Sequence, residues 1–564
     1  MLKNLYTSAG EQVSDTPWQV YPRPQLRRDS CLNLNGYWDF AVSAKETLPE
    51  TFDRTILVPF CPESLLSGVN EHFPEGSFLF YRRRLTLPEG FVKDRVILHI
   101  GAADQIAEVF VNGQSVGSHV GGYEAFSFDI THCLQEDNEL LIRVQDDLQN
   151  KALPYGKQTL TRGGMWYTPV SGIWQTVWLE SVPANYIESL QIRVSEASAT
   201  VQVIPALDGH ILFENKKVPL MEGMAVLSPE SPVLWSPENP HLYDFSVVAG
   251  QDRIDSYFAL RTLETKVVDG IPRLCLNGKP YFFHGLLDQG YWSDGIYTPA
   301  SPECYEEDIL AMKKLGFNTL RKHIKVEPAQ FYYDCDRLGM IVFQDMVNNG
   351  DYRFFWDTLL PTLMVQKLSD KRMHRDQATR QAFLDSMAAT VRQLQNHPSI
   401  CYWTIFNEGW GQFCADDAYD RLKELDDTRF IDATSGWFRR KKTDVDSRHI
   451  YFGPWGQLKK SDKPLVLSEF GGHCYPVEDH IFNPEKAYGY KSCKTLADFH
   501  RSIEKLYRKR ILPAVSKGLC AAIYTQVSDV EDEINGLLTY DRKVCKADQQ
   551  AMQALAVDLI QAMN

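Results

Sequence analysis

Two glutamates in the C-terminal half of the chain each follow a strand-like run of mainly apolar residues. The run ICYWTIFN leads directly into Glu408, and the run PLVLS leads into Glu469. Glycine and an aromatic residue come immediately after each carboxylate. A single glutamate at a strand end is most simply half of a structural ion pair. Two of them on different strands can instead supply the pair of carboxyl groups that glycoside hydrolysis requires.

The region from residue 268 to 564 has a pattern that would bring two strand ends together. Strand-like runs such as YFFHGLLD, NTLRKHI and IVFQDMV alternate with helical segments, among them PECYEEDILAMKKLGF and TRQAFLDSMAATVRQLQ. Apolar residues recur at helical spacing in these segments, as Ile309, Met312 and Leu315 do. The repetition predicts a (β/α)8 TIM barrel, whose active site lies at the C-terminal ends of its strands, where both glutamates are placed.

The first 267 residues predict two β-sandwiches. Short alternating runs separated by turn residues fill the stretch from about residue 30 to 182, a pattern typical of an all-β sandwich. Within it, Asn112-Gly113 lies between two apolar runs and predicts a tight hairpin. The shorter stretch that follows is long enough for an immunoglobulin-like sandwich. We therefore predict three domains, at residues 1–182, 183–267 and 268–564.

The composition argues against several classes of protein. The 564 residues include 59 Lys and Arg against 73 Asp and Glu, so the net charge of −14 disfavours nucleic acid as a partner. No apolar run reaches the roughly 18 residues of a membrane span, and the first residues contain no signal-peptide core. The 12 cysteines form no C-x-x-C pair. We expect a cytoplasmic protein with reduced thiols, no metal, no cofactor and no membrane contact.

The chain resembles glycoside hydrolase family 2 along nearly its whole length. The likeness is carried by RPQLRRDSCLNLNGYWDF, AEVFVNGQSVGSHVGGYEAF and SGIWQTVWLE in the sandwich region, and by LNGKPYFFHG, LGFNTLRKH, WTIFNEG and LVLSEFGG in the barrel region. The resemblance implies an N-terminal jelly-roll sugar-binding-like domain, an immunoglobulin-like sandwich and a catalytic TIM barrel. It also implies a retaining exo-β-glycosidase that forms a covalent glycosyl-enzyme, and a homo-oligomer, most simply a dimer.

The resemblance assigns roles to particular residues. Glu408 corresponds to the acid/base and Glu469 to the nucleophile. Asn407 corresponds to the asparagine that binds the sugar 2-hydroxyl, Tyr451 to a tyrosine that contacts the nucleophile, and Arg321 to an arginine that keeps the nucleophile ionised. Further candidates for the substrate pocket, each with core packing or a turn cap as the alternative, are Asp288, His323, Trp437 and Tyr524.

The terminal sugar is expected to be neutral, with galactose first. Family members that cleave β-glucuronides carry an Asn-x-Lys pair whose lysine binds the uronate, whereas Glu533 and Asn535 occupy those two places here. The surrounding loop is acidic and would repel a carboxylated sugar. A β-glucuronide or β-galacturonide becomes the substrate if Lys322 or Lys325 supplies the missing cation from another strand end.

Two alternative hypotheses, each from another functional class, are compatible with the same sequence features. A transglycosylase would form the same covalent intermediate but transfer the sugar to an acceptor other than water. A non-catalytic carbohydrate-binding protein could be built on an inactive hydrolase barrel, although both glutamates are present. Turnover of an aryl glycoside, with and without an acceptor alcohol, separates the three.

Overall fold

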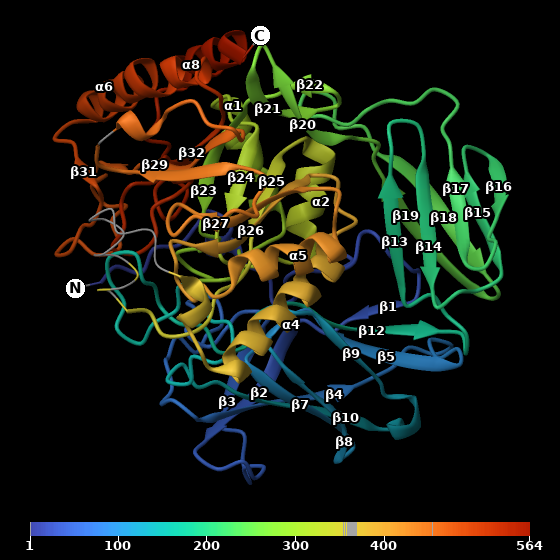
Figure 1. The fold of residues 1–564 in the computed structure, drawn as a ribbon. Helices are drawn as coiled ribbons and strands as arrows, with labels where there is room; N and C mark the ends of the chain where they lie inside the picture. The colour runs from blue at the N-terminus through green and yellow to red at the C-terminus, as the bar shows by residue number, and fades with distance from the viewer. Residues whose placement is uncertain (1, 354, 356, 358–368, 454, 564) are drawn as a thin grey trace.

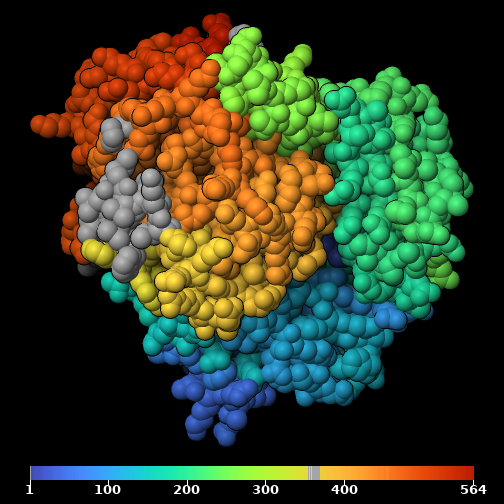
Figure 2. All heavy atoms as spheres, in the orientation of Figure 1, coloured from blue at the N-terminus to red at the C-terminus, as the bar shows by residue number. Residues whose placement is uncertain are grey.

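The computed structural model describes residues 2–353, 355, 357, 369–453 and 455–563. Two β-sandwiches and a barrel of parallel strands surrounded by helices make up these residues, in agreement with the predicted fold class (Figure 1). The N-terminal sandwich lies beneath the barrel and the second sandwich lies beside both. Figure 2 shows the three parts packed against one another.

The N-terminal sandwich consists of a six-stranded and a four-stranded antiparallel sheet, ordered β3-β2-β4-β10-β7-β8 and β1-β12-β5-β9. Apolar residues that alternate along these strands form its core, for example Trp38 and Phe40 in β2. Asn112 and Gly113, both with positive φ, form the tight turn between β7 and β8, as predicted. The strands are β1 Cys31–Asn33, β2 Gly36–Ser43, β3 Arg54–Val58, β4 Phe78–Leu85, β5 Arg95–Ile100, β7 Ile106–Val111, β8 Gln114–Val120, β9 Phe126–Asp129, β10 Asn138–Gln145 and β12 Val177–Val182, with the short pair β6 Ala103–Asp104 and β11 Gly172–Ile173.

The second sandwich packs a three-stranded sheet, β13-β14-β17, on a four-stranded sheet, β16-β15-β18-β19. It has a separate apolar core, with Val201 on one sheet and Val247 on the other. Its strands are β13 Ser189–Val194, β14 Ala199–Ile204, β15 Gly209–Phe213, β16 Lys216–Pro219, β17 Met224–Leu227, β18 Tyr243–Ala249 and β19 Asp252–Phe258. A small antiparallel sheet, β20 Leu263–Val268, β21 Ile271–Leu276 and β22 Lys279–Pro280, leads into the barrel.

Eight parallel strands form the barrel, in the order β27-β26-β25-β24-β23-β32-β29-β28. The end strands β27 and β28 contact each other, and Ser435 and Ser447 face each other across this seam with their hydroxyls 3.4 Å apart. The strands are β23 Phe283–Asp288, β24 Thr319–Lys322, β25 Ile341–Asp345, β26 Ile400–Asn407, β27 Phe430–Ser435, β28 Asp446–Ile450, β29 Leu465–Gly471 and β32 Leu519–Thr525. The main helices are α1 Glu303–Lys314, α2 Ala329–Leu338, α4 Gln377–Leu394, α5 Ala415–Leu425, α6 Leu496–Leu506, α7 Leu512–Val515 and α8 Gln549–Met563.

Strand alternation decides which side chains reach the barrel interior. Along β24 the side chain of Arg321 contacts residues of β25, β26 and β29, whereas the next residue, Lys322, has its ammonium 4.2 Å from the ring of Phe331 on α2. Successive residues of a strand point to opposite faces. The side chain of Arg321 therefore points into the barrel, and the side chain of Lys322 points outward.

Among the described residues, no helix is both long enough and apolar enough to cross a membrane. All twelve cysteines are free thiols, and nine of them are buried. Most of the cysteines therefore pack in the interior as small apolar residues.

Candidate active site

The two glutamates emerge at the C-terminal end of the barrel in different ways. Glu408 follows the last residue of β26 and has a φ of 52°, in the left-handed region, and its amide donates to the carbonyl of Ser435 on β27. Glu469 lies inside β29, which continues to Gly471 rather than ending at Ser468 as the sequence suggested. The side chain of Glu408 is 20% exposed and that of Glu469 only 5%. Glu408 is thus the carboxyl group closer to solvent.

His449 of β28 brings the two carboxyl groups together. Its Nδ1 lies 2.7 Å from Oε1 of Glu408 and 3.5 Å from Oε2 of Glu469. One carboxyl oxygen of each glutamate lies within 4.8 Å of the other. Carboxyl groups about 5–5.5 Å apart are typical of retaining glycosidases, whereas inverting enzymes leave about 6.5–9.5 Å for a water molecule. The short distance suits direct attack by one carboxylate on a sugar.

Glu469 is surrounded by hydrogen-bond donors. Nη1 of Arg321 donates to its Oε1 at 3.1 Å, and the hydroxyl of Tyr451 donates to its Oε2 at 2.6 Å. Burial alone would raise the pKa of Glu469, but the charges of His449 and Arg321 outweigh it and lower the pKa to about 2. Glu469 is therefore ionised at neutral pH, as a nucleophile must be.

Arg321 is itself held by neighbouring strands. Its Nε donates to Asp345 at 2.9 Å, and its Nη2 donates to Oδ1 of Asn407, also at 2.9 Å. Nδ1 of His323 contacts the same Asp345 at 2.7 Å, and burial lowers the pKa of His323 to about 4. The Nδ2 group of Asn407 makes no hydrogen bond within the part of the chain that the structure describes, so it remains available for a ligand.

Asp288 does not join this cluster. Its Oδ2 pairs with Nζ of Lys322 at 2.6 Å on the outward face, and its Oδ1 accepts the amide of Gly290 at 2.9 Å. Burial would raise the pKa of Asp288, but the charge of Lys322 lowers it. The turn-cap alternative therefore describes its surroundings better than a contact with sugar hydroxyls.

Tyr524 also points away from the two glutamates. Its ring packs edge-on against Phe470, and its hydroxyl accepts the amide of His473 at 3.3 Å. The next residue, Thr525, points inward and meets the hydroxyl of Tyr451 at 2.9 Å. The surroundings of Tyr524 therefore fit core packing, the alternative to a place in the substrate pocket, because Tyr524 is one position out of phase with the pocket.

Trp437 lies half-buried two residues beyond β27. Its amide donates to the carbonyl of Ser435, the same carbonyl that accepts the amide of Glu408. The backbone of Trp437 therefore lies close to that of Glu408, and its role in the substrate pocket stays a prediction.

His449 is the site residue that sequence reasoning missed. It stands two positions before Tyr451 in the run HIYFG, so strand alternation places both side chains on the same face. That spacing, taken with the assignment of Tyr451, was the available signal.

Glu408, His449 and Glu469 are also the one set of His, Cys, Asp and Glu ligand atoms in the described ranges that converges as a metal site would. Both oxygens of Glu469, however, already accept hydrogen bonds from Arg321 and Tyr451. The guanidinium supplies the positive charge that a divalent cation would bring. The donor set therefore fits an ionised nucleophile better than a metal ligand.

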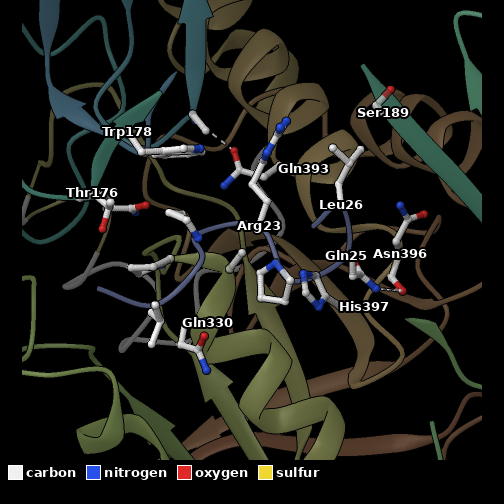
Figure 3. Close-up of a pocket in the computed structure, with 18 of the residues that line it drawn as sticks. Arg23, Gln25, Leu26, Thr176, Trp178, Ser189, Gln330, Gln393, Asn396 and His397 are labelled. Atoms are coloured by element: carbon white, nitrogen blue, oxygen red, sulfur yellow. Dashed lines mark hydrogen bonds between the residues drawn. The ribbon is translucent and has the colours of Figure 1, made fainter. Parts of the chain in front are cut away.

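A separate pocket of about 230 Å³ lies on the flank of the barrel, between α2, α4 and the two sandwiches (Figure 3). Gln330, Gln393 and His397 line it from the barrel side, and Trp178 lines it from the N-terminal sandwich. None of the catalytic candidates lines it. The pocket is therefore distinct from the site at the strand ends.

Comparison with models of known families identifies the family of the chain. The model for the TIM barrel domain of glycosyl hydrolases family 2 matches residues 267–557, and the model for the sugar binding domain of the same family matches residues 69–183. The chain belongs to glycosyl hydrolases family 2.

Several characterised proteins resemble the chain. A β-galactosidase from Thermoanaerobacter pseudethanolicus is 25% identical over 453 residues, which are 73% of this chain and 56% of that protein. The chain spans about half the length of the bacterial curated relatives that it matches in this way. A β-D-glucuronidase from Dictyoglomus thermophilum has a TM-score of 0.72 at 18% identity, covering 95% of this chain and 98% of that one. A β-galacturonidase from Eisenbergiella tayi has a TM-score of 0.67 at 18% identity, covering 97% and 99%.

Proposed function

We propose that the protein is a retaining exo-β-glycosidase that hydrolyses terminal β-linked sugars through a covalent glycosyl-enzyme. The observation that carries this proposal is the pairing of Glu408 and Glu469, whose carboxyl oxygens lie within 4.8 Å and share Nδ1 of His449. Family membership supports the same chemistry. This short distance supports a retaining mechanism, because inverting enzymes separate the two carboxyl groups by about 6.5–9.5 Å.

The reaction divides into two displacements. In the first, an oxygen of ionised Glu469 bonds to the anomeric carbon while Glu408 gives its proton to the glycosidic oxygen, and the aglycone departs as an alcohol. In the second, Glu408 takes a proton from water, whose oxygen bonds to the anomeric carbon as the bond to Glu469 breaks. The sugar leaves as its β-anomer, and both carboxyl groups return to their starting states.

The surrounding residues fit this division of labour. Arg321 and the hydroxyl of Tyr451 hold the Glu469 carboxylate ionised and oriented. The free amide of Asn407 is placed to bind the sugar 2-hydroxyl, a contact that strengthens as positive charge develops on the ring. Glu408, the more exposed carboxyl, faces the side from which an aglycone can leave.

For the terminal sugar we propose a neutral hexose, with β-galactosides first. Lys322 and Lys325, the two lysines named from the sequence as possible partners of a uronate, are buried and committed to other partners. Lys322 pairs with Asp288 at 2.6 Å, and Lys325 pairs with Glu327 at 2.9 Å. Neither is available to a uronate.

A β-glucuronide or β-galacturonide is the second candidate, because the solved relatives include enzymes with those names. An aryl glycoside panel decides between the two. We expect kcat/KM for the aryl β-galactoside to exceed that for the matching glucuronide and galacturonide. A tenfold advantage for either acid sugar would reverse the assignment.

The stereochemical outcome tests the mechanism itself. Proton NMR during turnover is expected to show the β-anomer first, and mass spectrometry after trapping with a 2-deoxy-2-fluoro glycoside is expected to find the sugar on Glu469. An initial α-anomer would contradict the retaining assignment. Transfer to an added alcohol faster than to water would identify a transglycosylase instead.

We also propose that the protein forms a homodimer through its β-domains. The edge strand β17 and its preceding turn expose the large apolar side chains of Met221, Met224 and Val226. An edge strand with exposed apolar side chains is a natural pairing surface.

A further inference from the structure

A loop of the N-terminal sandwich, residues 147–171, crosses the mouth of the barrel. Near its start, the amide of Tyr155 donates to the carbonyl of Asn348, and its hydroxyl donates to the carbonyl of Gly350, both in the loop after β25. Further along, the hydroxyl of Tyr167 donates to Glu533 at 2.5 Å, in the loop after β32. The loop is thus fixed to the loops that follow two separate barrel strands, β25 and β32, which are not neighbours in the sheet.

Lys157 lies between these two anchors. The preceding Gly156 has a φ of 63° and sits so close to the barrel that an added Cβ would come within 3.1 Å of the carbonyl of Ile324, just after β24. The carbonyl of Lys157 accepts the amide of Tyr167, and its ammonium lies 5.9 Å from the centre of the Tyr167 ring. The backbone of this segment therefore has little freedom to move away from the site.

The Lys157 ammonium makes neither a hydrogen bond nor an ion pair with any residue that the structure describes. Burial raises the pKa of Glu533, and the charge of Lys157 is the strongest influence that opposes this rise. The same charge helps His449 and Arg321 to lower the pKa of Glu469 against the effect of burial. Because the Lys157 ammonium lies beside the ring of Tyr167, whose hydroxyl donates to Glu533, this uncommitted cation is close to Glu533.

Glu533 presents the complementary group. It is 2% exposed, and it accepts hydrogen bonds from Tyr167 and from the amide of Asn535 at 2.8 Å. Within the described part of the chain, no cation pairs with it. Two nearby buried atoms, Oδ1 of Asn535 and Nε2 of Gln526, have no hydrogen-bond partner. A buried carboxylate without a cation and two buried polar atoms without a partner can be completed by the hydroxyl groups of a ligand.

We infer that Lys157 and Glu533 clamp hydroxyl groups of the terminal sugar, Lys157 as donor and Glu533 as acceptor. The inference rests on the proposed glycosidase function and names its substrate class, a neutral hexoside. A hydroxyl can accept from Lys157 and donate to Glu533 at once, which suits two opposite charges that do not touch each other. A uronate would bring a further carboxylate beside Glu533 and Glu469 with only Lys157 to offset it.

The test compares Lys157→Met with Lys151→Met. Lys151 is on the same loop, but its ammonium lies 3.9 Å from the ring centre of Tyr155, outside the proposed clamp. On an aryl β-galactoside we expect Lys157→Met to lower kcat/KM at least tenfold, because a hydrogen bond from a charged group is lost. Lys151→Met is expected to stay within twofold of the wild type. Matching melting temperatures of the two variants would show that folding is not the cause.

Deoxygenated substrates locate the clamp. Aryl galactosides that lack the 4-hydroxyl or the 6-hydroxyl are expected to be poor substrates of the wild type. For the hydroxyl that Lys157 holds, the Lys157→Met variant should process the parent and the deoxy sugar equally well. The clamp is overturned if, for both hydroxyls, removing the hydroxyl lowers kcat/KM of Lys157→Met by the same factor as it lowers kcat/KM of the wild type.

Binding measurements separate this inference from the proposed function. Calorimetry with isopropyl β-thiogalactoside, which is not hydrolysed, is expected to show at least tenfold weaker binding to Lys157→Met than to the wild type. Equal affinities overturn the clamp even if turnover is normal. A wild-type preference for uronides that Lys157→Met abolishes also overturns it and makes Lys157 a carboxylate-binding residue. Failure of the proposed function looks different, because no aryl glycoside would then be turned over and no sugar would be trapped on Glu469.

Discussion

Glu469 keeps its negative charge although its side chain is almost completely buried. Hydrogen bonds from Arg321 and Tyr451 and the nearby His449 replace the water that burial removes. Because the donors are fixed before substrate arrives, little reorganisation is needed when the carboxylate attacks. The reactivity of the proposed nucleophile therefore depends on neighbours from two other strands, Arg321 on β24 and His449 and Tyr451 on and just after β28.

Replacing the nucleophile is expected to stop the reaction without unfolding the protein. Glu469→Gln keeps the shape of the side chain and one of its two acceptor oxygens but removes its nucleophilic charge, so kcat should fall by at least roughly 10⁴-fold. Steady-state rates on an aryl β-galactoside measure the loss, and the melting temperature serves as the control. Residual activity above a hundredth of the wild-type rate would contradict the assignment.

Removal of the acid should affect substrates according to their leaving groups. Glu408→Ala is expected to lower kcat/KM by about 10²–10⁴-fold for a phenyl glycoside, which needs a proton, and by less than about tenfold for a 2,4-dinitrophenyl glycoside, which does not. An equal loss on both substrates would count against Glu408 as the acid.

The pH dependence of kcat/KM for Glu408→Ala tests whether Glu469, the proposed nucleophile, is ionised. The pKa of Glu469 is lowered from 4.5 to about 2, so its ionised form is lost only as the pH falls towards 2. Removing the neighbouring carboxyl takes away a like charge and cannot raise that pKa by repulsion. On the dinitrophenyl glycoside we expect kcat/KM of Glu408→Ala to be level between pH 4 and 7. A decline with a midpoint above pH 4 would show a less acidic nucleophile.

A chelator should leave the reaction unchanged. Since Arg321 already neutralises Glu469, the three convergent side chains have no need of a divalent cation. Dialysis against EDTA is expected to keep kcat/KM within about twofold, and addition of Mg²⁺ or Zn²⁺ should not raise it. Loss of activity on dialysis with recovery on adding metal would reverse this view.

At the scale of single elements, strand phase explains which site residues could be predicted. Glu408, Glu469 and Asn407 carry motifs specific enough to be placed directly. Asp288 and Tyr524 are each one residue out of phase with the pocket, and a shift of one position reverses the face of a strand. Sequence similarity locates the strand end, but which neighbour turns inward depends on bulges and turns. Register shifts between β28, β29 and β32 occur in this very region.

The turn after β26 sets the position of Glu408. Gly409 has a φ of 74°, and an added Cβ would lie 2.3 Å from the ring of Phe438. We expect Gly409→Ala to destabilise the protein by about 1–3 kcal/mol and to reduce kcat at least tenfold, because the backbone that carries Glu408 has to move. Denaturant unfolding and aryl glycoside turnover measure the two effects. Gly456→Ala, where a Cβ meets no atom within 4 Å, is the matched control and should change neither.

At the scale of the whole molecule, the architecture was predictable but the contacts between domains were not. Regular alternation and repeated strand–helix units indicate sandwiches and a barrel from local patterns alone. The approach of Lys157 to Glu533 depends instead on how a loop of one domain lies on another, and no local pattern encodes that. The acidic loop after β32 shows the same limit, because Asp529 and Asp532 are paired with Lys546 and Arg162. Glu533, in contrast, has no paired cation among the residues that the structure describes.

Light scattering tests the proposed dimer. A mass of twice 64.6 kDa is expected at micromolar concentration, since burial of the apolar side chains on β17 favours association. Val226→Lys places a charge in the middle of this surface and should return the mass to 64.6 kDa with the melting temperature kept. A wild-type mass of 64.6 kDa would rule out the dimer, and an unaffected dimer in the variant would place the interface elsewhere.

The contact between Tyr167 and Glu533 joins residues 366 positions apart and involves the loop that follows the final barrel strand. During synthesis, the sandwich leaves the ribosome with its loop long before that partner exists. The first barrel strand, β23, likewise waits for β32, its neighbour in the sheet. A chain interrupted before residue 533 therefore holds no complete sugar pocket, even if Glu408 and Glu469 have both been made. The sugar pocket is therefore completed only after the last barrel strand and its loop have been made, and shorter translation products are expected to be inactive.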